Sequence, residues 1–99
     1  MNENLKNIAE IINPTLAEYG IRFAGVFGSH ARGDATPQSD VDILVSLGDK
    51  RLSLWDMVSL REELSERLKK PVDLVSEGAV IPYFRDSIFR DLKIIYGTR

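Results

Sequence analysis

The sequence contains no cysteine and only one histidine, His30. Without cysteine the chain forms no disulfide and offers no thiolate to zinc, and a single imidazole does not complete a soft-metal cluster. Any metal ion is therefore expected to be a hard cation with oxygen ligands. The lack of cysteine is also typical of a reducing compartment, so we expect a cytoplasmic location.

Long apolar runs and an excess of positive charge are missing as well. No segment approaches the length of a membrane span, and residues 1–20 lack the basic start and continuous apolar core of a signal peptide. We therefore expect no membrane association. The formal net charge is -2, whereas proteins that bind a long phosphate backbone usually carry a basic face. A polymeric nucleic acid is a disfavoured partner.

What the sequence does contain is the composition of one folded domain. Its 99 residues are 43% hydrophobic and 28% charged, which is ordinary for a globular protein. A chain of this length has room for one core and one site. We therefore predict a single domain over residues 1–99.

The spacing of apolar residues predicts three helices. The first ends at Gly20, and Pro14 is expected to kink or divide it. The second covers residues 53–70 with Ser53 as its cap, and the third begins at Pro82. The apolar positions are Leu5, Ile8, Ile11, Ile12 and Leu16 in the first, Leu54, Met57, Leu60, Leu64 and Leu68 in the second, and Phe84, Ile88, Phe89 and Leu92 in the third.

Short β-branched and aromatic segments predict strands at 21–28, 40–47 and 72–75, with a further edge strand at 93–96. The link between the first two strands is too short for a parallel crossover, so these strands should be antiparallel. The link to the third strand contains a full helix, which favours a right-handed parallel crossover. We therefore predict an α/β domain with a mixed sheet of three or four strands flanked by helices.

The central motif is Gly28-Ser29, followed after ten residues by Asp40 and Asp42. Glycine lets the backbone approach a ligand closely, and Ser29 with the amides of a short helix at 31–34 can present N–H groups to a phosphate. Strand side chains alternate, so the two aspartates share one face, opposite the apolar one. From that face both can bind one magnesium ion or a metal pair.

The predicted topology brings a third acid to the same place. If the second and third strands are parallel, Asp73 lies near Asp40 and Asp42. A third carboxylate there can accept a proton from an attacking hydroxyl or hold a second metal ion.

The residues between the two halves of the motif have less specific predictions. Arg32 either steadies a phosphate with its planar fork of donors or forms a surface salt bridge with Asp34. Ser39 ends a segment that is mainly a turn, although its hydroxyl can reach a phosphate. His30 is expected to be a surface contact rather than a catalytic acid.

The aromatic residues are expected to lie mostly in the core. Tyr83, Phe84 and Phe89 have helical spacing, which favours core packing over a base-stacking platform. Trp55, with Leu52, is either the edge of the core or an anchor for a partner protein, and we expect the core edge.

The segment GSHARGDATPQSDVDILV, Gly28 to Val45, resembles the minimal nucleotidyltransferase (MNT) family of the DNA polymerase beta-like superfamily. Its hallmark is glycine-serine, ten residues, then aspartate-any-aspartate, and the resemblance extends over nearly the whole chain. It implies the polymerase beta-like fold and assigns triphosphate contacts to Gly28 and Ser29. It also implies magnesium ligands at Asp40 and Asp42, with Asp73 as the third acid.

The resemblance also implies a function. Family members of this size are commonly antitoxins paired with a HEPN ribonuclease toxin, and some neutralise the toxin by transferring AMP from ATP to a tyrosine. We therefore expect a magnesium-dependent protein adenylyltransferase. The alternatives are an antitoxin that acts by binding alone, and a nucleotidyltransferase that modifies a small molecule or an RNA end.

Overall fold

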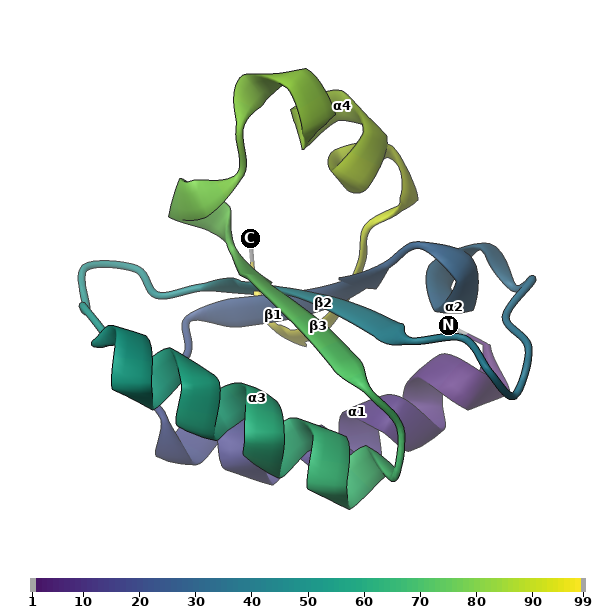
Figure 1. The fold of residues 1–99 in the computed structure, drawn as a ribbon, viewed down its shortest axis with the longest axis horizontal. Helices are drawn as coiled ribbons and strands as arrows, with labels where there is room; N and C mark the ends of the chain where they lie inside the picture. The colour runs from purple at the N-terminus through teal and green to yellow at the C-terminus, as the bar shows by residue number, and fades with distance from the viewer. Residues whose placement is uncertain (1, 99) are drawn as a thin grey trace.

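The protein is built on a sheet with helices on both faces (Figure 1). The structure is a computed structural model that describes residues 2–98. Its elements are α1 (Glu3–Glu18), β1 (Phe23–Phe27), α2 (Ser29–Arg32), β2 (Val41–Ser46), α3 (Leu54–Leu68), β3 (Val72–Ser76), the 3-10 helix η1 (Glu77–Ala79), α4 (Pro82–Asp91) and β4 (Lys93–Gly97). The four strands lie in the order β3-β2-β1-β4.

The strand pairing is that predicted from the link lengths. Strand β2 is antiparallel to β1 and parallel to β3, and β4 is antiparallel to β1. The predicted α/β fold with a mixed sheet is therefore confirmed, including the edge strand at the C-terminus. As a result, the end of β1, the start of β2 and the start of β3 meet at one end of the sheet.

Helices α1 and α3 cover one face of the sheet, and the hydrophobic core lies between them and the strands (Figure 1). Val41, Ile43 and Val45 are fully buried on this face, as the alternation of β2 predicted. Burial of such side chains contributes roughly 1.5–3 kcal/mol each, which fixes the register of β2 and hence the face on which Asp42 lies.

Helix α1 continues through Pro14 to Glu18, so the predicted division of the helix at this proline is wrong. A proline inside a helix removes one backbone hydrogen bond. Ile12 and Leu16, on either side of it, are both fully buried. Their packing outweighs the lost hydrogen bond and keeps the helix in one piece.

Helix α3 begins at the predicted cap. The Ser53 hydroxyl accepts a hydrogen bond from the amide of Asp56, whose carboxylate accepts one from the amide of Ser53 in return. The first turn, however, projects beyond the core. Leu54 and Trp55 are 76% and 78% exposed, so their predicted places in the core stripe and at its edge are wrong.

Helix α4 lies on the opposite face of the sheet (Figure 1). None of its ten residues, all described by the structure, is buried. Tyr83 is 86% exposed and Phe84 is 51% exposed, because none of the other helices within residues 2–98 lies over α4 to cover them (Figure 1). Phe89 is half-buried and lies under the guanidinium of Arg85. The predicted core positions of Tyr83 and Phe84 are therefore wrong.

The end of α4 is better anchored than its start. A Cβ atom added at Gly25 in β1 would lie 2.6 Å from Cδ1 of Leu92, so the absence of a side chain at Gly25 lets Leu92 pack directly on the strand.

Within residues 2–98, no helix has both the length and the apolar character needed to cross a membrane.

Candidate active site

The turn after β1 passes directly against Asp42. Gly28 has φ +74° and ψ -151°, a conformation that is essentially restricted to glycine. A Cβ atom added at Gly28 would overlap Oδ2 of Asp42. This close approach follows from the antiparallel pairing in which Phe27 lies opposite Asp42. Gly28 therefore allows the turn and the carboxylate to occupy the same small region.

The acids gather on one face, as predicted. Asp42 lies directly beside Asp73 in the parallel pair of β2 and β3, so the backbones of these two residues are about 4.8 Å apart. Asp40 precedes Asp42 by two residues and is exposed. Asp73 is also exposed, at the edge of the sheet. The structure thus brings the three predicted acids to one end of the sheet.

The surroundings of Asp42 disfavour its charged form. Its pKa is raised above the ordinary value, first because burial disfavours the charged carboxylate and then because Asp73 and Asp40 repel it. His30 and Arg32 act in the opposite direction and lower the pKa of Asp42. A partly buried carboxylate beside two further acids is an arrangement that a nearby positive charge would favour.

The donor set fits a hard divalent cation. Carboxylate oxygens are ligands that magnesium prefers, and it is usually held by one or two carboxylates together with water and substrate phosphates. Among residues 2–98, no group of three or more His, Cys, Asp or Glu side chains is placed to hold a metal ion by itself.

The turn after β1 forms the short helix α2, which begins at Ser29, two residues earlier than predicted. The amides of Ala31 and Arg32 donate to the carbonyl of Gly28, and the amide of Gly33 donates to the carbonyl of Ser29. These bonds fix the turn next to Asp42. The first amides of such a turn have no helical partner and are suited to an anion.

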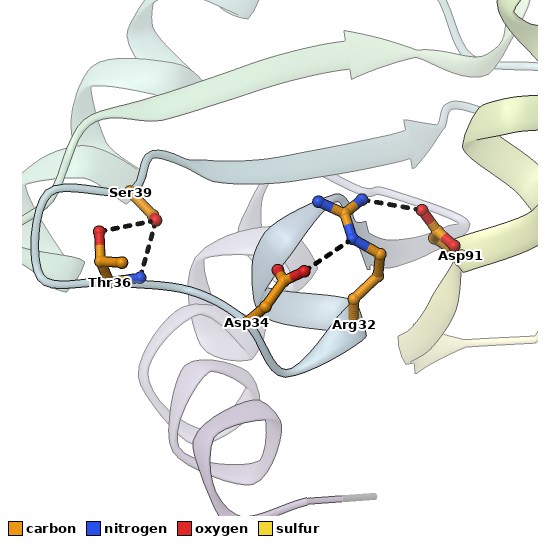
Figure 2. Close-up of polar contacts among 5 residues, drawn as sticks. All are labelled: Arg32, Asp34, Thr36, Ser39 and Asp91. Atoms are coloured by element: carbon orange, nitrogen blue, oxygen red, sulfur yellow. Dashed lines mark hydrogen bonds and ion pairs between the residues drawn. The ribbon is translucent and has the colours of Figure 1, made fainter.

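Arg32 has two carboxylate partners (Figure 2). Its Nε donates to Oδ2 of Asp34 at 3.3 Å, and its Nη1 donates to Oδ2 of Asp91 at 3.0 Å. The hydrogen bonds with Asp91 and then Asp34 raise the pKa of Arg32 above its usual range. The salt bridge with Asp34 was one of the two predicted alternatives. The contact with Asp91 was not predicted, because it depends on the pairing of β4 with β1.

Ser39 takes part in the turn that returns the chain to β2. Its hydroxyl accepts a hydrogen bond from the amide of Thr36 at 2.8 Å and lies 3.3 Å from the hydroxyl of Thr36 (Figure 2). This is the structural role that the sequence indicated first. Contact between Ser39 and a phosphate stays a prediction.

His30 is buried, with 4% of its surface exposed, so its predicted place as a surface contact is wrong. Its Nδ1 lies 2.9 Å from Nδ2 of Asn4, which joins α2 to the start of α1. The physical reason is that α1 packs beside α2 and covers the ring. A single histidine in the motif gave no sign of this contact, because Asn4 lies 26 residues away.

Comparisons with known proteins agree with this geometry. A model of the polymerase beta nucleotidyltransferase family matches residues 10–99. A protein from Methanocaldococcus jannaschii, named provisionally as a protein adenylyltransferase, is 39% identical over 88 residues, which cover 89% of this chain and 94% of the relative. The chain is thus a nucleotidyltransferase by class.

Solved structures give the same fold. A toxin-antitoxin structure with AMP-PNP superposes with a TM-score of 0.81 at 24% identity, covering 92% of this chain and 74% of the other. A tri-AMPylated Shewanella oneidensis HEPN toxin in complex with an MNT antitoxin gives a TM-score of 0.68 at 21% identity, covering 96% and 71%. At these identities the likeness shows a shared fold.

The chain belongs to the polymerase beta nucleotidyltransferase family. The resemblance to its minimal nucleotidyltransferases, drawn from residues 28–45, is confirmed by the relative and by a solved structure named provisionally as a minimal nucleotidyltransferase. That structure is 36% identical and superposes with a TM-score of 0.76 over 92% of each chain.

Replacing Gly28 with alanine is expected to destabilise the protein by roughly 3 kcal/mol, because the new methyl group is strained at this φ and overlaps Asp42. Gly33→Ala is the matched control. Gly33 also has a positive φ, +87°, but no atom lies within 4 Å of an added Cβ, so its cost should be about 1 kcal/mol. Urea denaturation measures both. Equal losses would show that the approach to Asp42 is not tight.

Asp42→Asn is expected to raise the thermal stability of the metal-free protein at neutral pH. The raised pKa means that the folded state binds the Asp42 proton more tightly than the unfolded chain does. Ionisation of Asp42 therefore destabilises the fold, and this penalty grows as the pH rises from about 4 through the raised pKa.

Melting scans between about pH 4 and pH 8 check the sign. The advantage of Asp42→Asn over the wild type should be present near neutral pH and shrink as the pH falls. Asp49→Asn, which changes an exposed acid beyond the other end of β2, should give no such trend. A variant at Asp42 that is less stable than the wild type at every pH would contradict the electrostatic account.

Proposed function

We propose that this protein is a magnesium-dependent adenylyltransferase that transfers AMP from ATP to a hydroxyl group of a partner protein. The observation that supports this most directly is the juxtaposition of the Gly28 turn with Asp42 and Asp73. A triphosphate held by the turn lies next to carboxylates that can hold its metal ion. The acceptor hydroxyl then needs only a group that takes its proton. The carboxylate of Asp73, on the neighbouring strand, can do so.

Each predicted residue has a place in this proposal. Gly28 and Ser29 hold the triphosphate through the turn, Arg32 adds a positive charge, and Ser39 shapes the loop. The carboxylates of Asp40 and Asp42, with Asp73 beside them, would hold magnesium. When bound, the cation neutralises the phosphates and supports in-line displacement at the α-phosphorus.

The proposed reaction exchanges one bond at the α-phosphorus for another and moves one proton. The acceptor oxygen forms a bond to the α-phosphorus of ATP, and the bond between the α-phosphorus and the bridging oxygen breaks, so that pyrophosphate leaves. The proton of the hydroxyl passes to the carboxylate of Asp73. Asp73 suits this role because it is exposed at the sheet edge, where an acceptor can reach it.

We propose a HEPN-type toxin as the partner and the cytoplasm as the place of action. Two fold neighbours support this partner, since one is a toxin-antitoxin structure with AMP-PNP and the other pairs an MNT antitoxin with an AMPylated HEPN toxin. A nucleic-acid substrate is not proposed, because the net charge is -2. The neutralising activity of the protein would follow from modification of the toxin.

The binding-only alternative is less well supported. Burial and mutual repulsion raise the pKa of Asp42, so the acid cluster costs the folded protein stability at neutral pH. A protein that acts by contact alone gains nothing from that cost. The proposed use of the cluster in catalysis accounts for it.

The three acids should contribute differently to catalysis. Asp73→Asn should still bind magnesium ATP but transfer AMP roughly 100- to 10,000-fold more slowly, because a general base is lost while nucleotide binding is spared. Asp42→Asn should lose both binding and transfer, because it removes a metal ligand. Calorimetry with magnesium ATP and transfer of labelled AMP to the partner measure the two properties. Full transfer by Asp73→Asn would refute the role of this acid.

A partner surface at the start of α3 is also expected. Trp55 is 78% exposed and lies beside exposed Leu54, whereas Leu52, the other predicted candidate, packs partly against the core. Exposed aromatic side chains often anchor protein interfaces. Trp55→Ala should therefore weaken complex formation with the toxin by about 10-fold or more.

Tyr83→Ala is the matched control for this surface, because Tyr83 is also highly exposed but belongs to α4, on the other side of the sheet. Binding of both variants to the toxin can be measured by calorimetry after circular dichroism has shown that they are folded. Weakened binding by Tyr83→Ala alone would place the interface on α4 instead.

A further inference from the structure

The contact between Arg32 and Asp91 joins two parts of the molecule that are far apart in the sequence. Asp91 is the last residue of α4, and Arg32 is the last residue of α2. Their side chains are 24% and 49% exposed, respectively, and Nη1 of Arg32 lies 3.0 Å from Oδ2 of Asp91. The turn after β1 is therefore tied to the helix on the Asp42 face of the sheet.

The position of Asp91 is fixed by the sheet rather than by α4. Strand β4 runs antiparallel to β1, and Lys93 lies opposite Val26. The residues just before β4 consequently lie beside the turn that follows β1. Leu92 is further held against the backbone of Gly25. Asp91 is thus held in place by the residues that follow it, although most of α4 is exposed.

The two carboxylates also define the orientation of the Arg32 guanidinium. Asp34 accepts from Nε and Asp91 accepts from Nη1. A guanidinium is planar, so two contacts at different nitrogens fix its plane. Figure 2 shows the remaining terminal nitrogen on the side of the guanidinium that points away from Asp91, with no dashed contact drawn to it. Its hydrogens can therefore serve another acceptor while both contacts are kept.

The contact does not have the character of a stabilising element. Ion pairs between exposed side chains are worth about 0–1 kcal/mol at most sites, because water screens them and the side chains lose entropy. What such a contact changes is the direction in which a long and flexible side chain points. We therefore expect the contact to affect ligand binding rather than the stability of the fold.

We propose that Asp91 is a positioning residue for the nucleotide, which holds Arg32 so that its free terminal nitrogen meets a triphosphate oxygen. This inference rests on the proposed function, because it takes ATP as the ligand. It adds a residue outside the Gly-Ser and Asp-x-Asp motif to the nucleotide site. The C-terminal part of the chain, through Asp91, thereby takes part in substrate binding.

Simple electrostatics predicts the opposite effect, which makes the test decisive. Asp91 carries a negative charge near the place of a polyanion, so removing that charge should by itself strengthen ATP binding. If Asp91 positions Arg32, the same change should weaken ATP binding. Whether ATP binding becomes stronger or weaker therefore distinguishes simple electrostatic repulsion from the positioning of Arg32.

The experiment uses the full chain and compares Asp91→Asn with Asp86→Asn. Asp86 lies on the same helix and is exposed, so its variant has the same change of charge. With magnesium present, Asp91→Asn should raise the Kd for ATP, and the KM for ATP in AMP transfer, by roughly 10-fold, as expected for the loss of one charged hydrogen bond. The kcat and the melting temperature should change little. Asp86→Asn should bind ATP no more weakly than the wild type.

Two further variants test the link to Arg32. Asp91→Glu keeps the carboxylate and should recover part of the affinity. Asp91→Asn combined with Arg32→Lys should bind ATP no more weakly than Arg32→Lys alone, because both changes remove the same contact.

The calorimetric data decide the role of Asp91. ATP binding by Asp91→Asn that equals or exceeds that of the wild type overturns the inference, as does equal weakening by Asp86→Asn. If the wild type binds ATP but transfers no AMP, the proposed function fails while the comparison of ATP affinities still tests Asp91. If the wild type does not bind ATP, both fail.

Discussion

The site depends on the close approach of a backbone turn to a carboxylate. Gly28 lies against Asp42, and the lack of a side chain at Gly28 makes that approach possible. The antiparallel pairing of β1 and β2 produces this contact, and the parallel pairing of β2 and β3 adds Asp73 beside it. The other elements support these two pairings: α1 and α3 bury the apolar face of β2, and β4 completes the sheet beside β1.

The arrangement has an electrostatic cost that the fold bears without a ligand. Asp42 is partly desolvated and is repelled by Asp73 and Asp40, while Arg32 is shared with two other carboxylates. In the proposed function a bound cation would offset this repulsion and so raise the stability of the folded protein.

The features that local pattern determines could be predicted from the sequence. Alternation in β2 indicated which face carries Asp42, and the lengths of the links indicated both strand directions. The exposures of Trp55, Tyr83 and Phe84 could not be predicted, because apolar spacing shows that a helix has an apolar side but not whether another element covers it. The contacts of His30 with Asn4 and of Arg32 with Asp91 were missed for a related reason. They span 26 and 59 residues and depend on tertiary packing.

The place of Asp73 on an edge strand has a consequence for the kind of acceptor that the domain can modify. Strand β3 has a neighbour on one side only, and the side chain of Asp73 is exposed there. In the proposed reaction an acceptor hydroxyl would approach from this open flank without threading into a tunnel. A tyrosine or serine on the outside of an intact, folded partner would then be within reach, with no need for a flexible peptide or partial unfolding of the target.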